Sequence, residues 1–275
     1  MTTALSTAIE AWDKRWATAE GRADWLHPDP DVMALLPELK ARGVHAVLDL
    51  GCGVGRHALF LAEHGLAVEA IDGSAAGLAV VRETAQARGV TLGLRLGAAD
   101  ALPFDDESFD FVLSWNVIYH GTLGDVGRRL AEIWRVLKPG ALYQGTMLTT
   151  RNTNYGRGRP VAPDTFVVDG AEERDHPHFY CDATTLVALF AGFELLSLKQ
   201  QQQRKPGSWH CTSSPSAGRS RQRLVCGNRH ARLVHHQVKS VGNLISPGID
   251  GWPNRCPTTQ STLPRSRSPF CQSCR

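Results

Sequence analysis

The stretch that most constrains this chain is an apolar segment followed at once by three glycines at alternate positions. Residues 44–50 form an apolar run that predicts a strand covered on both faces. Gly51, Gly53 and Gly55 follow it, and residues 58–63 then show a helical pattern. A strand, a glycine loop and a helix in this order bring backbone N–H groups close to a small ligand at the carboxyl edge of an α/β sheet.

Two carboxylates near this loop describe the ligand that it would hold. The glycine spacing is GxGxG, not the GxGxxG that suits a dinucleotide pyrophosphate. Asp49 lies at the end of the first strand, where its charge would repel a diphosphate and attract a cationic group. The next predicted strand, residues 67–71, ends at Asp72, which is well placed to accept hydrogen bonds from ribose hydroxyls. These residues describe a ligand with a ribose and an ammonium but no phosphates.

Four motifs follow one another in order along roughly residues 44–150. They are DLGCGVGR at 49–56, AIDGS at 70–74, DALPF with SFDFV at 100–112, and LKPGAL at 137–142. In this order and spacing they resemble the motifs of class I S-adenosylmethionine-dependent methyltransferases. The resemblance implies a Rossmann-like, doubly wound α/β sheet of seven strands in the order 3-2-1-4-5-7-6. Residues 55–62 are also similar to the small-molecule branch that includes methyltransferase type 11 and tellurite-resistance-type enzymes.

The resemblance implies S-adenosyl-L-methionine as the methyl donor and a small molecule as the acceptor. In the family, an acid at the position of Asp100 accepts from the adenine amino group, and Ala101 contributes its backbone N–H. The alternative is that Asp100 merely caps the turn before Pro103. The segment after the fourth strand passes beside the reacting methyl. We therefore expect the cofactor to contact Asp49, Gly51, Cys52, Gly53, Gly55, Arg56, Asp72, Gly73, Ser74, Asp100, Ala101, Ser114, Trp115 and Asn116.

Methyl transfer from a sulfonium needs a general base only when the acceptor is protonated. His120 is the predicted base, with Tyr119 beside it, because both follow the fourth strand at the cofactor edge. His176 and His178 flank a proline, and capping the following helix is an alternative role for them. Arg56 is placed either to meet the cofactor carboxylate or to pair with a surface acid. We expect no metal site, because the one CxxC pattern lacks a properly spaced partner pair.

Composition limits the class of partner. The hydrophobic share is 42%, and no apolar run approaches the roughly 20 residues that span a bilayer. No secretory signal is visible at the start, so we expect a cytoplasmic enzyme without a membrane partner. Residues 1–210 hold 20 Lys/Arg and 26 Asp/Glu, whereas residues 211–275 hold 10 Lys/Arg and one acid. The excess of positive charge therefore lies in residues 211–275. No basic groove or aromatic platform in the sequence indicates a nucleic-acid acceptor.

Three regions are expected. Residues 1–43 predict a helical cap with Trp12, Trp16 and Trp25, either packed across one sheet edge or placed as a lid over the cofactor. Residues 44–210 form the predicted methyltransferase domain. Residues 211–275 predict a basic low-complexity tail, either disordered or read from a shifted frame. A seventh strand is expected just after residues 206–210, but residues 211–215 begin like a strand and stop, which leaves that strand in doubt.

Two other functions use the same fold. A nicotinamide-dependent oxidoreductase would need GxGxxG and no acid at Asp49, and the sequence has neither feature. A non-catalytic regulator that binds S-adenosylmethionine would keep the binding motifs. The acceptor and the oligomeric state are not readable from the residues.

Overall fold

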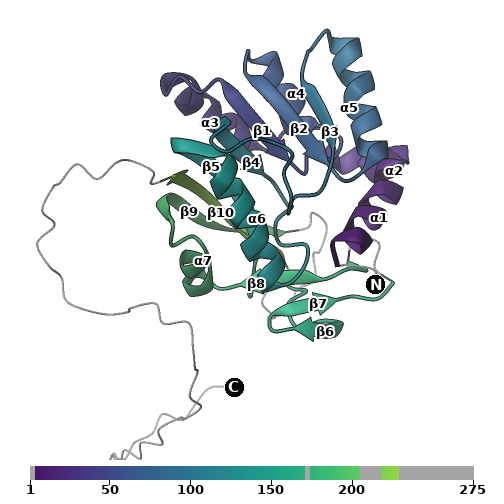
Figure 1. The fold of residues 1–275 in the computed structure, drawn as a ribbon. Coiled ribbons are helices and arrows are strands. Elements are labelled where there is room, and N and C mark those ends of the chain that lie inside the picture. Colours follow the sequence, from purple (N-terminus) through teal and green to yellow (C-terminus); the bar gives the residue numbers. More distant parts are fainter. Residues whose placement is uncertain (1–3, 171–173, 205–217, 229–275) are drawn as a thin grey trace, which may run out of the picture. The chain divides into compact units, whose positions relative to one another are not determined.

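The computed structural model describes residues 4–170, 174–204 and 218–228 (Figure 1). Seven of its strands pair in the order β3-β2-β1-β4-β5-β10-β9. The first five are parallel, and β10 runs antiparallel to both of its neighbours. This is the predicted 3-2-1-4-5-7-6 order, so the predicted fold class is confirmed. The strands are β1 (Ala46–Leu50), β2 (Ala67–Asp72), β3 (Gly93–Leu96), β4 (Phe109–Ser114), β5 (Leu137–Thr149), β9 (Phe193–Arg204) and β10 (Gly218–Asn228).

The seventh strand comes from beyond the predicted domain boundary at residue 210. β10 pairs with β5 from Arg221↔Leu148 to Gly227↔Leu142, and on its other side with the whole of β9. An empty interior position would leave two rows of backbone groups unpaired, so this strand completes the sheet. The sheet therefore extends into the segment predicted as a tail. The rest of that segment, residues 211–217 with the strand-like start at 211–215 and residues 229–275, lies outside the described residues.

Helices cover both faces of the sheet. Along β1, Val47 packs into the core under α3 (Pro30–Ala41), α4 (Arg56–Glu63) and α5 (Ala75–Arg88). Its neighbours Leu48 and Leu50 pack into the opposite core, under α6 (Leu123–Val136) and α7 (Ala183–Leu189). The alternation follows from the two-residue period of a strand. Parallel strands buried on both faces place their carboxyl ends along one edge, where ligands bind in this class of fold.

The helix ends follow the capping residues in the sequence. The Oγ of Ser74 accepts a hydrogen bond from the Gly77 N–H at 2.9 Å, and Gly89 ends α5 in the left-handed conformation with φ +66°. The helix α6 begins at Leu123, because Thr122 is its cap. Asp125 accepts from the Thr122 N–H at 2.6 Å and completes a capping box.

The polar segment after β5 forms a small strand layer at the carboxyl end of β5. β8 (His178–Cys181) pairs parallel with the end of β5, at Leu148↔Tyr180 and Thr149↔Cys181. β7 (Thr165–Val167) pairs antiparallel with β8, and β6 (Arg159–Ala162) with β7. This β6–β8 layer extends the sheet beside the edge where the site is expected.

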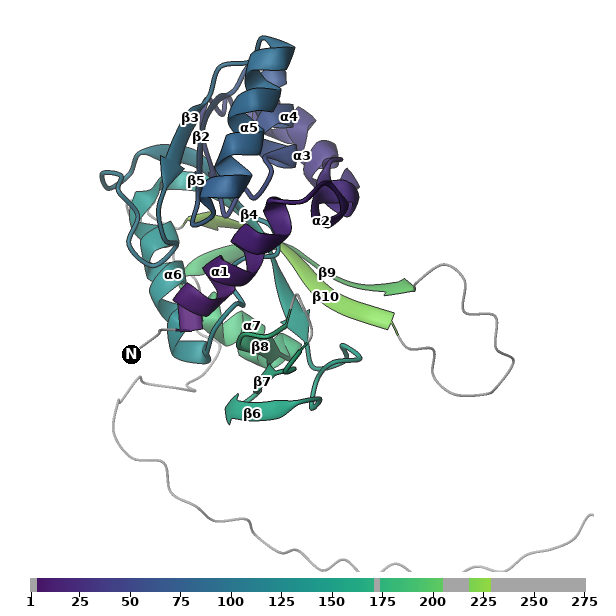
Figure 2. The same ribbon diagram turned by 90° about the vertical axis from the view of Figure 1, so that its right-hand side faces the viewer.

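The N-terminal segment runs between α5 and the β6–β8 layer, as both views show (Figures 1 and 2). It contains α1 (Ala4–Trp16), α2 (Ala19–Arg22) and the short 3₁₀ helix η1 (Ala23–Trp25). α1 contacts α5. The described part of residues 1–43 is therefore mostly helical, with α3 covering one face of the sheet and α1 lying against α5.

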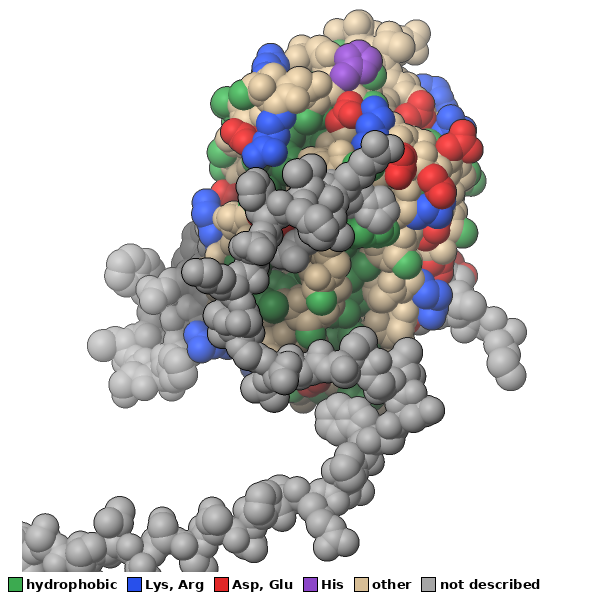
Figure 3. Space-filling view, turned by 60° about the vertical axis from the view of Figure 1, so that its left-hand side comes forward, with side chains coloured by type: hydrophobic (Ala, Val, Ile, Leu, Met, Phe, Trp, Pro, Cys, Tyr) green, Lys and Arg blue, Asp and Glu red, His purple; other side chains and the backbone are tan. Residues whose placement is uncertain are grey.

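The surface and the helix lengths bear on possible partners. On the face that Figure 3 shows, acidic and basic side chains of the described residues are interspersed, with no continuous basic patch. Surface pairs such as Arg42–Glu38 and Arg88–Glu63 contribute to this mixture. Within the described ranges, no helix has the length and apolar character needed to cross a membrane.

Candidate active site

The loop after β1 is held in a conformation that only glycine fits. The Gly51 N–H donates to the Ile71 carbonyl at 2.8 Å, which ties the loop to β2. Gly51 has φ +69°, and a Cβ there would lie 2.4 Å from a methyl group of Val117. Gly55 has φ +78° at the start of α4, where a Cβ would lie 2.7 Å from Val81. A side chain at either glycine would bring both steric overlap and backbone strain.

Asp72 lies at the end of β2, and its carboxylate spans the loop. Its Oδ2 accepts from the Gly53 N–H at 2.7 Å, and its Oδ1 accepts from the Ser74 N–H at 2.8 Å. Burial raises the pKa of Asp72, and these backbone hydrogen bonds oppose the shift. A carboxylate can accept about four hydrogen bonds, so capacity remains for a ribose diol. Asp72 also lines the cavity at this edge.

Asp49 lies behind the loop, with only 1% of its surface exposed. Its Oδ2 is buried and has no hydrogen-bond partner. Burial raises the pKa of Asp49 to about 7, against the opposing effects of the Ala58 N–H and the Arg56 charge. An unsatisfied buried carboxylate oxygen is the kind of group that an ammonium would neutralise. On this observation the residues present fit the amino-acid end of S-adenosylmethionine.

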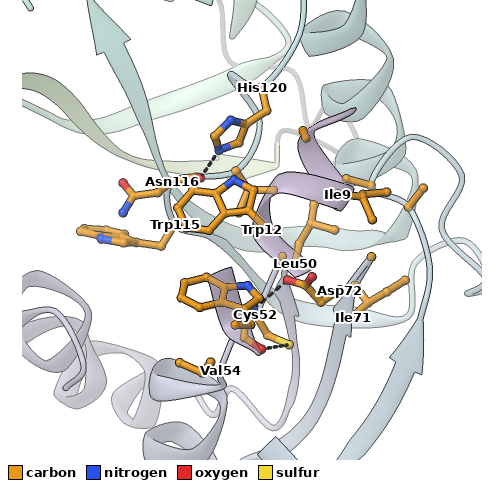
Figure 4. A pocket seen from close by; sticks show the side chains of 18 of the residues that line it. Ile9, Trp12, Leu50, Cys52, Val54, Ile71, Asp72, Trp115, Asn116 and His120 are labelled. Atoms are coloured by element: carbon orange, nitrogen blue, oxygen red, sulfur yellow. Dashed lines mark hydrogen bonds between the residues drawn. The ribbon is translucent and has the colours of Figure 1, made fainter. Parts of the chain in front are cut away.

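A cavity of about 110 Å³ opens between the glycine loop and α1. The rings of Trp12, Trp16 and Trp25 pack together, with centroids 4.9 to 5.5 Å apart, and all three line the cavity. Trp16 also touches the loop, since a Cβ on Gly53 would lie 3.1 Å from its ring. The N-terminal helices thus pack against the sheet edge and also cover the cavity. Figure 4 shows Trp12 between His120 on one side and Asp72 on the other.

The residues after β4 form the wall opposite Asp72. Asn116 has φ +67°, an uncommon conformation for a residue with a side chain. Its N–H donates to the Thr146 Oγ1 at 2.8 Å, and that hydroxyl donates back to the Asn116 Oδ1 at 3.1 Å. Trp115 and Asn116 line the cavity. Ser114 does not, because its hydroxyl pairs with the Tyr143 hydroxyl at 2.6 Å in the core.

Both ring nitrogens of His120 have partners. The Asn116 carbonyl can only accept, so the Nε2–H of His120 donates to it at 2.9 Å. The Nδ1 of His120 then accepts from the Nε2–H of His176, also at 2.9 Å. Burial lowers the pKa of His120 well below its usual range, and His178 and His176 lower it further. His120 lines the cavity, but it can take a proton only if His176 releases this hydrogen bond.

Tyr119 does not reach the cavity. Its side chain is buried, and its ring lies 4.7 Å from that of His120. Its carbonyl accepts from the Phe179 N–H at 2.9 Å, which ties the loop after β4 to β8. Tyr119 therefore supports His120 and is not part of the cavity wall.

His176 and His178 do not cap the following helix, so that alternative is wrong. The cap of α7 is Asp182, whose Oδ1 accepts from the Thr185 N–H at 2.8 Å. His178 begins β8, and its Nδ1–H donates to the His176 carbonyl at 2.9 Å. Both histidines instead lie against His120.

Nine of the predicted residues line the cavity, and the rest lie behind or beside it. Those that line it are Gly51, Cys52, Gly53, Arg56, Asp72, Gly73, Trp115, Asn116 and His120. The others are Asp49, Gly55, Ser74, Asp100, Ala101, Ser114 and Tyr119. On the predicted adenine side, the wall is made by Gly97, Ala98 and Ala99. Asp100 lies just beyond, close enough to Arg129 to oppose the lowering of that residue's pKa by burial.

Arg56 contributes to the wall where the cap meets α4. Its guanidinium lies 5.1 Å from the centre of the Trp25 ring and donates to the His27 carbonyl at 3.3 Å. Arg56 thus joins the loop helix to the N-terminal segment, within reach of the cavity. The predicted meeting with a cofactor carboxylate stays a prediction.

Arg129 lines the cavity and was not predicted. It is 1% exposed, and its Nη1 donates to the carbonyls of Ile118 and His120. Its Nε and Nη2 have no hydrogen-bond partner. The available sequence signal was its place on α6, where it falls within the inward stripe of Val126, Leu130 and Ile133. A charged residue on a buried stripe is a candidate for function.

The comparisons with known proteins agree with this fold and loop. Residues 47–140 match the family model of a methyltransferase domain. A malonyl-[acyl-carrier protein] O-methyltransferase of Salmonella typhimurium is 36% identical over 115 residues, which cover 42% of this chain and 43% of that protein. An uncharacterised methyltransferase of Mycobacterium tuberculosis is 33% identical over 178 residues, 64% of this chain and 63% of that protein. A solved S-adenosylmethionine-dependent methyltransferase of Methanosarcina mazei superposes with a TM-score of 0.59 at 20% identity, over 74% of this chain and 99% of that one.

The fold and the loop define a Rossmann-like domain with a ligand site at the carboxyl edge of its parallel strands. The family match makes residues 47–140 a methyltransferase domain, in a chain whose sequence and fold resemble class I S-adenosylmethionine-dependent methyltransferases. The chain spans 43% to 63% of the length of the two curated relatives described above.

Proposed function

We propose that this chain transfers a methyl group from S-adenosylmethionine to a small-molecule acceptor. The observation that carries the proposal is the pair of acids around the glycine loop. Asp72 retains acceptor capacity toward the cavity, and Asp49 has a buried oxygen without a partner. Both carboxylates would repel a diphosphate. A ribose, in contrast, can donate hydrogen bonds to Asp72, and an ammonium can neutralise Asp49. This argues against a nicotinamide cofactor.

Each wall of the cavity has a role in this proposal. Asp72 binds the ribose, and the small residues at 97–99 leave room for the adenine. Asp49 neutralises the ammonium from behind the glycine loop. Bound S-adenosylmethionine supplies a methyl on a sulfonium, a good leaving group for in-line displacement. The chain must then align the acceptor and exclude water. The three tryptophans serve that purpose, because they cover the cavity with large, rigid apolar surfaces.

The acceptor side lies toward His120 and the β6–β8 layer. Of the three histidines on this side, His120 is the one that lines the cavity. Its hydrogen bond to His176 links it to the segment just before β8. As a base, His120 would accept the acceptor's proton at Nδ1 after His176 turns away. The small cavity and the interspersed charges on the face that Figure 3 shows favour a small acceptor over a nucleic acid. A cytoplasmic location stays a prediction from the sequence.

Calorimetry and a methylation screen test the proposal. We expect S-adenosylhomocysteine to bind the full chain with a dissociation constant in the micromolar range and NAD⁺ not to bind. Binding of NAD⁺ in preference to S-adenosylhomocysteine would overturn the proposal. Labelled S-adenosylmethionine, offered with thiols, phenols, amines and carboxylic acids, then separates an enzyme from a regulator. A regulator would bind the cofactor equally well and label none of them.

A further inference from the structure

Three imidazoles from two distant segments meet beside the cavity. His120 follows β4, His178 begins β8, and His176 lies two residues before it. They are 7%, 6% and 1% exposed. One ring nitrogen of each lies within 4.8 Å of the others. Among the described residues, this is the one cluster of three or more His, Cys, Asp or Glu side chains whose ligand atoms lie close enough to share a metal ion.

The ring orientations are set by backbone carbonyls. His120 gives its Nε2–H to the Asn116 carbonyl, so its Nδ1 faces the cluster. His178 gives its Nδ1–H to the His176 carbonyl, so its Nε2 is the nitrogen in lone-pair form. The Nε2 of His176 faces the Nδ1 of His120 at 2.9 Å. Histidines that bind metals commonly donate their other N–H to a carbonyl, which fixes the tautomer in this way.

The backbone holds the two segments together independently of the rings. The Gly121 N–H donates to the Pro177 carbonyl at 2.8 Å, and the Phe179 N–H donates to the Tyr119 carbonyl at 2.9 Å. An isolated bridge also joins His120 and His178. Because these contacts lie on both sides of the cluster, the three rings are positioned before any ion binds.

We propose that His120, His176 and His178 bind one transition-metal ion of the Zn²⁺ class. Imidazole nitrogens at about 2.0–2.1 Å from a tetrahedral ion are about 3.4 Å apart. The His120–His176 pair must therefore open by about 0.5 Å, and the widest pair must close by about 1.4 Å. Rotations of the side chains cover such distances. A set of three imidazoles without carboxylates suits Zn²⁺, Co²⁺, Ni²⁺ or Cu²⁺ and not Mg²⁺ or Ca²⁺.

The alternative is a hydrogen-bonded imidazole cluster that binds no ion. Its ring-to-ring hydrogen bond runs from the Nε2–H of His176 to the Nδ1 of His120. The Nδ1 of His176 is buried without a hydrogen-bond partner and would stay so with an ion on Nε2. Coordination bonds to all three rings would hold the cluster together more strongly than one neutral hydrogen bond. The ion would join the loop after β4 to β8, one imidazole ring away from the cavity. The proposal does not depend on methyl transfer, but an ion at the Nδ1 of His120 takes the lone pair that a base would use, so His120 could not be the base in the ion-bound chain.

Cobalt spectroscopy on the full chain, without a histidine tag, separates the two arrangements. We expect one Co²⁺ per chain, with the strong visible bands of a tetrahedral site. The chain also has seven cysteines, and a thiolate site would add a near-ultraviolet charge-transfer band. We expect that band to be absent. Weak bands of six-coordinate Co²⁺, or a dominant thiolate band, would overturn the proposal.

Matched variants locate the ion. His176→Gln and His178→Gln should each weaken Co²⁺ and Zn²⁺ binding at least about 100-fold, because each removes a ligand outright. His64→Gln removes an exposed imidazole just after α4 and should change nothing. Neither His176 nor His178 lines the cavity, so S-adenosylhomocysteine should bind these variants within about twofold of the natural chain. Retained metal binding in the His176→Gln, His178→Gln double variant would refute the site. If the variants do not fold, the cobalt spectrum of the natural chain decides alone.

Discussion

Asp13 on α1 accepts a hydrogen bond from the hydroxyl of Ser74 at 2.6 Å, and Ser74 is the cap of α5. The same Asp13 oxygen accepts from the Ala76 N–H at 2.9 Å. Ser74 in turn donates its own N–H to Asp72. One carboxylate therefore fastens the tryptophan-bearing helix to the residues that bind the ribose in our proposal. The cavity of about 110 Å³ is smaller than typical ligand pockets, so we expect α1 to shift when the cofactor enters.

Asp13→Ala should loosen this connection and speed both entry and release of the cofactor. The change removes two hydrogen bonds to a carboxylate, each worth about 1.5–3 kcal/mol before solvent screening. We expect the dissociation rate of S-adenosylhomocysteine, followed by tryptophan fluorescence in stopped flow, to rise about tenfold. Glu10→Ala, an exposed acid on the same helix, is the control. Equal rates in both variants would mean that α1 does not gate the cavity.

Asp72→Asn should weaken cofactor binding by more than a loss of folding stability alone would explain. The amide can accept at only one atom, so it cannot bind the two backbone N–H groups and a ribose diol together. We expect the dissociation constant for S-adenosylhomocysteine to rise at least about tenfold in calorimetry. Asp110→Asn is the matched control, since Asp110 accepts from the N–H groups of His45 and Ala46 away from the cavity. It should lower the melting temperature and leave the affinity unchanged.

The raised pKa of Asp49 predicts opposite effects of pH on stability and on binding. Its pKa is about 7 in the folded chain and 3.8 in the unfolded one, so the folded state binds the extra proton between these values. The contribution of Asp49 to stability is full below about pH 4, falls as the pH rises toward 7, and is absent above. Asp49→Asn should therefore melt higher than the natural chain at pH 8. The difference should vanish near pH 4 in thermal unfolding followed by circular dichroism.

Cofactor binding should follow the ionised form of Asp49. An ammonium beside the carboxylate favours the charged state, so the affinity for S-adenosylhomocysteine should rise from pH 6 to pH 8. In Asp49→Asn this rise should disappear. Calorimetry at both pH values checks this prediction. If the affinity of Asp49→Asn rises from pH 6 to pH 8 as much as that of the natural chain, another titrating group is responsible.

Gly51→Ala should abolish cofactor binding through the backbone. Its φ is +69°, and the added Cβ would lie 2.4 Å from Val117 across the loop. Gly65→Ala is the control, because Gly65 has φ +87° but nothing within 4 Å of the added Cβ. The control should lose about 1–2 kcal/mol of stability from left-handed strain and keep its affinity. Gly51→Ala should show a larger fall in melting temperature and no binding of S-adenosylhomocysteine.

Local patterns predicted the part of the site that lies on neighbouring strands. Gly51, Gly53, Asp72 and Asn116 all line the cavity, because the carboxyl ends of parallel strands share one edge. Arg129 was missed because a buried charge on an apolar stripe is visible only once the stripe is known to face the cavity.

The amino-acid sequence by itself determined the order of strands and helices, the glycine bend and the two acids around it. Each of these features depends on residues that are near one another in the sequence, where conformational propensity and steric limits act directly. Only the tertiary structure decided which segment fills the interior strand position and that His120 meets His176, which is 56 residues away. Such long-range pairings depend on which backbone N–H and C=O groups need hydrogen-bond partners across the whole sheet. No short-range pattern in the sequence predicts them.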